Sequence, residues 1–290
     1  MKICLIVNPE IEPRLAVVRR IRDFLIAGNQ TVHLTEAISA RLPKPPSPSP
    51  LVSVFPTEEQ AISGTDAVIA IGGDGTMLHT ARLVGEASTP ILGINSGRLG
   101  FLADTQLQDL ESALGHLISD NWEIEERFML AAEWNGNQAL AFNEFLFTKH
   151  SGVAMITLEV FCDDQKINKY WADGLIIASP TGSTAYNLSA GGPIIFPETD
   201  VMVITPVCPH ALTTRPLVLP ADRVITVKAT PASQQILFSN DGKICNINNE
   251  ELTDIRISKS RFNVRLIKLP GRNYFETLRA KLMWGKDLRE

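Results

Sequence analysis

The residues best suited to chemistry in this chain lie in one turn, Gly72-Gly73-Asp74-Gly75. Six strand-like residues lead into the turn and a helix-like segment follows it, so a carboxylate lies inside a glycine turn. Glycine permits positive φ and close approach of a ligand, and the N–H groups of such a turn and of the following helix attract phosphate. An acid among these donors suits a base or a metal ligand. An ordinary strand-to-helix turn with an Asp cap is the alternative, so other motifs must decide.

A second unusual segment covers residues 172–193 and is dense in small polar residues. Asp173 precedes an apolar run, and the following loop offers hydroxyls, backbone amides and the ring of Tyr186. These groups suit the ribose, amide and base of a nucleotide. A serine nucleophile would need G-x-S-x-G, which Gly182-Ser183-Thr184 does not supply, so binding is favoured over hydrolysis. A Ser/Thr-capped helix after a turn is the alternative.

Other polar residues occur where partners are needed. Asn143 and Glu144 lie inside the apolar stretch 139–147, where they incur a desolvation penalty unless they are bonded. A ribose diol would satisfy both, because an amide donates and accepts while a carboxylate accepts. A strand end turning into solvent is the alternative. His79, one turn after Asp74, and His150 are available titratable groups, with a solvated helix position as the alternative for His79.

The first part of the chain alternates strands and helices. Residues 2–7, 67–71 and 91–94 are nearly continuous apolar runs typical of strands covered on both faces, and residues 13–27 and about 76–86 have helical periodicity. This alternation predicts a Rossmann-like α/β domain with a parallel sheet, whose ligands bind outside the carboxyl ends of the strands. The glycine turn and the loop at 93–100 would both lie at that edge, although a plain turn also explains the second loop.

From residue 122 the pattern changes to short apolar runs separated by turn signals, which predicts an all-β domain with antiparallel strands. The predicted strands are 128–134, 139–148, 153–162, 174–179, 201–205, 223–229, 235–239, 254–258 and 262–268. Asp241-Gly242 is predicted to be a hairpin turn. Residues 274–283 have helical periodicity. We therefore expect domains at 1–121 and 122–269, with about 270–290 packing back on the first.

Five prolines between residues 43 and 50 predict an extended or mobile loop inserted in the first domain. The 290 residues, 44% of them hydrophobic, suffice for two domains. The net charge of −5 argues against nucleic-acid binding and anionic membranes. With no secretory signal or run of 18 apolar residues, we expect a cytoplasmic protein without membrane contact. The four cysteines are widely spaced and are expected to be reduced.

Two common nucleotide signatures are absent from the sequence. G-x-x-x-x-G-K-[ST] does not occur, which excludes a P-loop enzyme. The segment from Gly73 to Leu78 begins a G-x-G-x-x-G match but lacks its last glycine, which disfavours a hydride-transferring Rossmann enzyme.

Taken together, five motifs resemble the NAD kinase family in their order and spacing. They are Gly72-Gly73-Asp74-Gly75-Thr76, residues 93–101, Asn143-Glu144, residues 172–174 and residues 180–186. The resemblance implies transfer of the γ-phosphoryl group of ATP to the 2′-hydroxyl of the adenosine ribose of NAD, giving NADP. It also implies an α/β domain, a C-terminal β-sandwich and a homodimer or homotetramer.

The resemblance also implies roles for individual residues. Asp74 is expected to be the catalytic base, and Gly72, Gly73, Gly75 and Thr76 to bind the phosphates of ATP. The residues expected to contact NAD are Asp74, Gly75, His79, Asn143, Glu144, Asp173, Thr184, Ala185, Tyr186, Asn187, Leu188 and Ser189. Mg²⁺ or another divalent cation would be bound mainly through ATP phosphates, with no dedicated protein metal site.

Some alternatives stay open at the level of sequence. Trp171 replaces a residue that is basic in several relatives, which puts that contact in doubt. Lipid and sugar kinases share the Gly-Gly-Asp-Gly turn, and a silent NAD-binding sensor would keep the pocket without turnover. ATP or polyphosphate as donor, acceptance of NADH, and feedback by NADP are also undecided.

Overall fold

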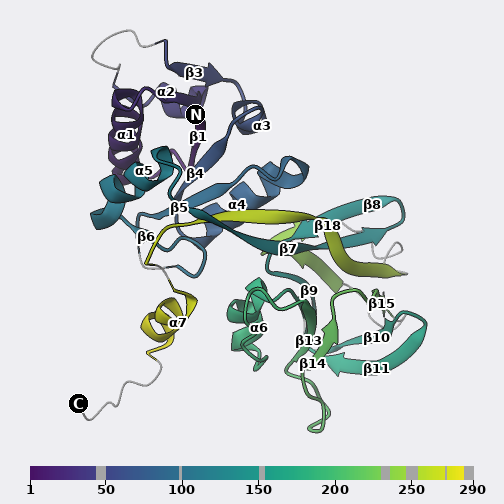
Figure 1. Ribbon diagram of the computed structural model, residues 1–290. Coiled ribbons are helices and arrows are strands. Elements are labelled where there is room, and N and C mark those ends of the chain that lie inside the picture. Colours follow the sequence, from purple (N-terminus) through teal and green to yellow (C-terminus); the bar gives the residue numbers. More distant parts are fainter. Residues whose placement is uncertain are drawn as a thin grey trace. The chain divides into compact units, whose positions relative to one another are not determined.

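The computed structural model describes residues 1–43, 50–97, 100–149, 154–229, 236–245, 254–271 and 273–283 (Figure 1). The chain forms two compact units, which we call unit 1 (Met1–Glu126 with Val264–Glu290) and unit 2 (Arg127–Asn263). The chain passes between them within strands β7 (Glu123–Trp134) and β18 (Ile255–Lys268). Most of the Pro-rich loop, His150, and residues 98–99 of the second glycine loop lie outside the described residues.

Unit 1 contains a parallel sheet with the strand order β3-β2-β1-β4-β5. Its strands are β1 (Lys2–Val7), β2 (Thr31–Thr35), β3 (Val52–Phe55), β4 (Ala67–Gly72) and β5 (Ile91–Asn95). The short β6 (Thr105–Gln106) and the end of β18 also pair with β5 in parallel. Every residue of β4 and β5 is buried, which explains their continuous apolar sequences. The predicted Rossmann-like α/β fold is confirmed.

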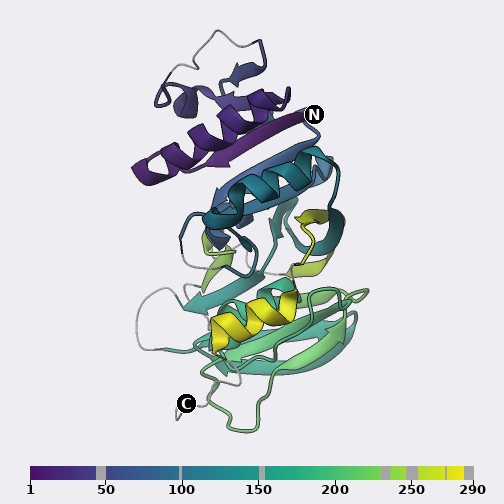
Figure 2. The same ribbon diagram turned by 60° about the vertical axis from the view of Figure 1, so that its left-hand side comes forward.

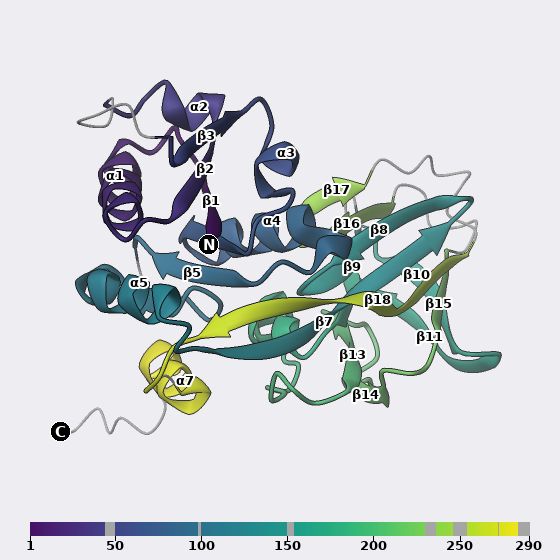
Figure 3. The ribbon, with the colours of Figure 1, turned by 45° about the horizontal axis from the view of Figure 1, so that its top comes forward.

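Helices cover both faces of this sheet. They are α1 (Glu12–Ala27), α2 (Glu36–Ser39), α3 (Glu58–Ile62), α4 (Asp74–Val84) and α5 (Leu110–Ile118), with 3₁₀ turns η1 (Gly85–Ala87) and η2 (Leu107–Asp109). Helices α1 and α5 pack together on the face that carries Ile3, Leu5 and Val7 (Figures 2 and 3). Because side chains alternate along a strand, β1 meets α3 and α4 on its other face. A last helix, α7 (Tyr274–Leu282), belongs to unit 1.

Unit 2 is a sandwich of antiparallel strands. One sheet contains part of β7, β8 (Asn137–Ala141), β10 (Ile156–Cys162), β11 (Gln165–Ala172), β15 (Ile225–Ala229) and part of β18. The other has the order β14-β13-β12-β9-β16-β17, with β9 (Glu144–Lys149), β12 (Gly174–Ala178), β13 (Val201–Val207), β14 (Leu217–Pro220), β16 (Ile236–Asn240) and β17 (Lys243–Cys245). A continuous apolar core, which includes the buried Phe145, Phe147 and Phe238, joins the two sheets.

Two strand predictions were wrong in detail. The runs 254–258 and 262–268 form one strand, β18, because the polar residues between them stay extended, with the buried side of the strand changing between residues 257 and 260, rather than making a turn. The run 139–148 forms two strands, β8 and β9, which belong to different sheets. The hairpin turn at Asp241-Gly242 is confirmed, with positive φ at both residues and β16 paired to β17. None of the helices in the described ranges is long and apolar enough to cross a membrane.

Candidate functional site

A cavity of about 560 Å³ lies where the strand order of unit 1 reverses, between the carboxyl ends of β1 and β4. In open α/β sheets, such a reversal leaves a crevice that binds ligands, because the connections on its two sides run in opposite directions. The cavity is lined by Ile6, Val7, Asn8, Pro9, Arg14, Glu58, Gly73, Gly75, Thr76 and His79. The sequence-predicted glycine turn therefore borders a real cavity.

The glycines of the turn differ in what they do. A Cβ on Gly72 would lie 2.0 Å from Oγ1 of Thr76, so any side chain there would displace the start of α4. Gly73 and Gly75 face open space instead, with nothing within 4 Å of a Cβ position. Helix α4 begins at Asp74 without a side-chain cap, so the N–H groups of Asp74 and Gly75 are available to an anion, while that of Thr76 donates to the Gly73 carbonyl.

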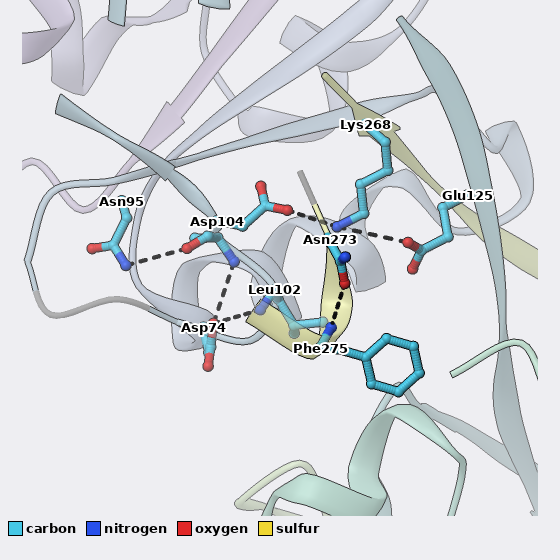
Figure 4. Close-up of polar contacts among 9 residues, drawn as sticks. Asp74, Asn95, Leu102, Asp104, Glu125, Lys268, Asn273 and Phe275 are labelled. Carbon is cyan, nitrogen blue, oxygen red and sulfur yellow. Dashed lines mark hydrogen bonds and ion pairs between the residues drawn. The ribbon is translucent and has the colours of Figure 1, made fainter. Parts of the chain in front are cut away.

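The Asp74 carboxylate is fixed by the backbone of residues 101–103, and Figure 4 shows its bond to Leu102. Oδ1 accepts from the N–H groups of Leu102 at 2.9 Å and Ala103 at 3.3 Å, and Oδ2 accepts from that of Phe101 at 3.0 Å. A carboxylate has about four acceptor positions, so these three bonds leave Oδ2 able to accept one more hydrogen. A Cβ on Gly100 would lie 2.1 Å from Oδ1, so this approach requires glycine.

The loop that holds Asp74 is itself anchored on both sides (Figure 4). The Asn95 amide donates to the Ala103 carbonyl at 3.2 Å. On the other side Asp104 forms an ion pair of 2.8 Å with Lys268 of β18, and Lys268 lies 3.7 Å from Glu125. All three side chains of this triad are largely buried, so solvent screens the ion pairs weakly. The loop therefore presents its N–H groups to Asp74 from a fixed position.

His79 lies at the same cavity, and its side chain is already engaged. Its Nε2 lies 2.6 Å from Oε2 of Glu58, at the start of α3. The His79 side chain is 48% exposed and that of Glu58 29% exposed, so the pair lines the cavity without being sealed from water.

Asn143 lies in the break between β8 and β9 in unit 2, and Glu144 is the first residue of β9. The carboxylate of Asp241 accepts from the N–H groups of Phe142 at 2.9 Å, Asn143 at 2.8 Å and Glu144 at 3.2 Å. The Asp241 N–H donates in return to the Glu144 carbonyl. Asp241 was assigned only to a hairpin turn from the sequence, and its second role follows from the pairing of β16 with β9.

Glu144 is only 8% exposed, and among the described residues its Oε2 has no hydrogen-bond partner. Burial, and then the negative charge of Asp241, raise the pKa of the Glu144 carboxyl to about 8. A buried acid without a partner is costly to the fold and is typical of a position where a ligand completes the bonding.

Residues 181–189 form a 3₁₀ turn, η3 (Thr181–Thr184), and one short helix, α6 (Tyr186–Ser189), on the outer face of β12 and β13. Tyr186 is 43% exposed and offers a stacking surface. Asn187 is fully buried, and its amide donates to the carbonyls of Ser183 and Pro193 while Oδ1 accepts from Thr205 at 2.5 Å. The Asn187 side chain thus anchors the segment from inside.

Asp173 precedes β12 and is held by Lys149, whose Nζ lies 2.7 Å from Oδ1 of Asp173. The backbone N–H of Lys149 also donates to the Asp173 carbonyl. Both side chains are about one third exposed. A partly exposed ion pair of this kind contributes little to stability, and it leaves the Asp173 carboxylate accessible from solvent.

The predicted site residues therefore fall into two groups. In unit 1, Gly73, Gly75, Thr76 and His79 share one cavity, with Asp74 fixed at the turn between them. In unit 2, the predicted residues lie on β9, in front of β12, and on η3 and α6. Sequence reasoning missed Asn8, Arg14 and Glu58, which line the cavity from the segments after β1 and β3. The end of the apolar run 2–7 was the signal that could have found Asn8 and Arg14.

A switch-point cavity, an uncapped helix start after a glycine turn, and a fixed acid in that turn are typical of an α/β protein of the class that binds nucleotide phosphates. Its family is identified by comparison of sequences. Residues 3–122 match the family described as ATP-NAD kinase N-terminal domain, and residues 142–269 match the ATP-NAD kinase C-terminal domain. The chain belongs to the ATP-NAD kinase family, which confirms the resemblance of its motifs.

Individual relatives agree with this assignment. The NAD kinase of Flavobacterium johnsoniae is 41% identical over 241 residues, 81% of each chain, and that of Flavobacterium psychrophilum is 36% identical over 279 residues, 94% of each chain. Among solved structures, yeast NADH kinase complexed with NADH is similar with a TM-score of 0.86 at 24% identity, covering 100% of this chain and 89% of that one. An NAD kinase from Archaeoglobus fulgidus in complex with ATP gives a TM-score of 0.76 at 24% identity, covering 98% and 99%. At these identities the two structures show a shared fold.

Proposed function

We propose that this chain transfers the γ-phosphoryl group of ATP to the 2′-hydroxyl of the adenosine ribose of NAD, producing NADP. Membership of the ATP-NAD kinase family and the curated NAD kinases that resemble the chain support this reaction. The single structural observation that carries it is the Asp74 carboxylate, fixed by three N–H groups in a glycine turn beside a cavity.

In the proposed step, the oxygen of the 2′-hydroxyl attacks the γ-phosphorus while the bond from that phosphorus to the β,γ-bridging oxygen breaks. ADP leaves, and the hydroxyl proton passes to Oδ2 of Asp74, the oxygen with a free acceptor position. Phosphoryl transfer has a loose transition state, so the main contributions are positioning and charge neutralisation. Fixing the carboxylate beforehand lowers the entropy lost on reaching that geometry.

The donor phosphates are proposed to bind at the glycine turn, through the N–H groups of Gly73 and Gly75 and the side chain of Thr76, with Gly72 allowing the close turn. A divalent cation, Mg²⁺ by preference, would be held mainly by these phosphates. The described residues hold no group of three or more His, Cys, Asp or Glu side chains placed to bind a metal, and Glu58 is the carboxylate that lines the cavity. This donor set fits a cation carried by its nucleotide, which would neutralise charge on the phosphates.

NAD is proposed to contact Asp74, Gly75 and His79 in unit 1. In unit 2 its proposed contacts are Asn143, Glu144, Asp173 and residues 184–189. The unpartnered Glu144 carboxyl suits a ribose hydroxyl or an adenine amine, and the exposed Tyr186 ring suits stacking. Asn187 is fully buried and its side chain is already bonded, so it would act on NAD by holding this segment in place.

The direct test is incubation of the purified protein with NAD, ATP and Mg²⁺, followed by an NADP-specific dehydrogenase assay. We expect NADP to accumulate with ATP and NAD, and no phosphorylation of diacylglycerol or fructose 6-phosphate. Phosphorylation of either alternative acceptor without NADP would overturn the proposal. Parallel assays with inorganic polyphosphate and with NADH define the donor and the redox form accepted.

We also propose a cytoplasmic homodimer or homotetramer, with domains at 1–121 and 122–269 and residues 270–290 returning to the first.

A further inference from the structure

Arg14 is a cation at the switch-point cavity that the sequence motifs do not include. It lies in the first turn of α1, directly after the loop that leaves β1, and it lines the cavity together with Gly73, Gly75 and Thr76. Its side chain is partly exposed. Within the described ranges the guanidinium forms no ion pair or hydrogen bond. A guanidinium carries five N–H donors in a planar fork, so its binding capacity is unused here.

The acids close to Arg14 in sequence are already paired with another residue. Arg41 forms an ion pair of 2.6 Å with Glu12 and one of 3.7 Å with Glu10, and it also donates to the Pro9 carbonyl. Arg41 therefore both fixes the loop after β1 and removes the partners that Arg14 would otherwise find.

The acid that lines the cavity is also partnered. Glu58 lies 2.6 Å from the Nε2 of His79, which offsets part of its repulsion toward an anion. Of the charged side chains that line this cavity in the described ranges, Arg14 is thus the one without a partner. Its guanidinium offers an anionic ligand a local positive charge, although the whole chain is acidic.

The remaining donors at this cavity point to the same ligand chemistry. Helix α4 begins at Asp74 without a side-chain cap, whereas the first turn of α1 adds few donors, because Pro13 has no N–H and the Arg14 N–H donates to the Ile11 carbonyl. The Asn8 side-chain oxygen accepts from the Glu10 N–H, which orients its amide group. An uncapped helix start, an oriented amide and a guanidinium together suit a chain of phosphates better than a single small anion.

We propose that Arg14 binds the polyphosphate chain of the phosphoryl donor and sets the affinity for that donor. The inference rests on the proposed function, and it deepens it by naming a donor-specific residue outside the family motifs quoted above. Arg14 acts on binding of the donor, and the chemical step stays with Asp74. ATP and inorganic polyphosphate both contain the chain of phosphates that this site would bind.

The test compares steady-state kinetics of Arg14→Ala, Arg14→Lys and a control, Arg19→Ala, with the wild-type protein. Arg19 lies on the same helix, its side chain is 60% exposed, and it does not line this cavity. For Arg14→Ala we expect the ATP KM to rise about 10- to 100-fold, as for loss of charged hydrogen bonds, with the NAD KM within about 2-fold of wild type. Lysine keeps the charge but not the fork, so Arg14→Lys should be intermediate. If inorganic polyphosphate is used as a donor, its KM should rise in the same order across these variants.

A binding measurement separates this inference from the proposed reaction. Inorganic tripolyphosphate should raise the melting temperature of the wild-type and Arg19→Ala proteins and leave that of Arg14→Ala unchanged, whichever acceptor is phosphorylated. Equal protection of all three proteins, or of none, refutes the role of Arg14 even if NADP is made. A rise in the NAD KM with an unchanged ATP KM would assign the guanidinium to the acceptor and refutes it as well. Failure to form NADP, with tripolyphosphate protection lost only in Arg14→Ala, would refute the reaction and leave the phosphate site standing.

Discussion

Two aspartates in this chain use their carboxylates in the same way, as acceptors for three consecutive backbone N–H groups. Asp74 holds residues 101–103 in unit 1, and Asp241 holds residues 142–144 in unit 2. Each bond to an ionised acceptor is stronger than a neutral one, so three together fix a loop firmly. The loop at 101–103 lies at the end of the motif 93–101, and the loop at 142–144 contains the motif Asn143-Glu144. For Asp74 the arrangement also fixes the acid itself.

Replacing Asp74 with asparagine tests its role in the chemistry. Asp74→Asn keeps the size and one acceptor oxygen but removes the proton acceptor, so we expect kcat to fall by about 10²-fold or more. NAD binding, measured by calorimetry, should stay within a few-fold of wild type. Unchanged turnover would remove Asp74 from the mechanism.

Glu144 predicts an unusual pH dependence of stability. Its pKa is raised from an ordinary value of 4.5 to about 8 in the folded protein, so the native state binds its proton more tightly than the unfolded state does. Stability contributed by the protonated acid is complete below the unfolded pKa and is lost as pH rises through the folded pKa. Glutamine cannot ionise, so at pH 9 Glu144→Gln should melt at a higher temperature than wild type, with an unfolding free energy larger by up to roughly 4 kcal/mol. Near pH 4.5 the two proteins should differ little in stability.

The control for Glu144 is Glu159→Gln in ligand-free protein. Glu159 pairs with Lys166 on the surface, and the hydrogen bond from that lysine lowers the pKa of its carboxyl. Its substitution should change the melting temperature little at any pH, because an exposed ion pair contributes little. If wild-type protein is as stable as Glu144→Gln at pH 9, then burial does not raise the pKa of the Glu144 carboxyl.

At the scale of elements, the position of Asp74 depends on a loop with no room for a side chain. In Gly100→Ala, the new Cβ would lie 2.1 Å from Oδ1 of Asp74, so either the loop or the carboxylate must move. We expect kcat to fall at least about 10-fold and stability to fall by about 1–3 kcal/mol, as for other overpacked sites.

Gly115 in α5 provides the matched glycine control. A Cβ there meets nothing within 4 Å, so Gly115→Ala should stabilise the helix by about 0.5–1 kcal/mol and leave turnover unchanged. The idea that Gly100 positions the acid fails if Gly100→Ala retains the wild-type kcat.

At the scale of the molecule, the chain of 31.8 kDa is expected to assemble with copies of itself, as the family resemblance implies. Leu212 is 89% exposed and Val218 is 42% exposed on the β13–β14 side of unit 2, which leaves apolar surface available for an interface. Light scattering after size exclusion should give a mass of two or four chains at micromolar concentration. A monomer at that concentration would contradict the expectation.

Local patterns in the sequence determined the fold class, the strand-rich second half and the family. Continuous apolar runs predict buried parallel strands because burial on both faces leaves no position for polar residues. The Gly72–Gly75 turn was recognisable because backbone conformation and close approach restrict residue type there. The same reasoning erred at residues 139–148, where apolar residues continue through a turn that Asp241, about 100 positions later, helps to hold open.

Only the tertiary structure decided which groups face a cavity and which are already bonded. Arg14 and Glu58 reach the switch-point cavity because β1 and β4 are neighbours in the sheet while β2 and β3 lie to one side. Asn187 carries a family position, yet its amide is used by Ser183, Pro193 and Thr205. Hydrogen bonds between distant residues depend on strand order and register, which a single sequence does not encode position by position.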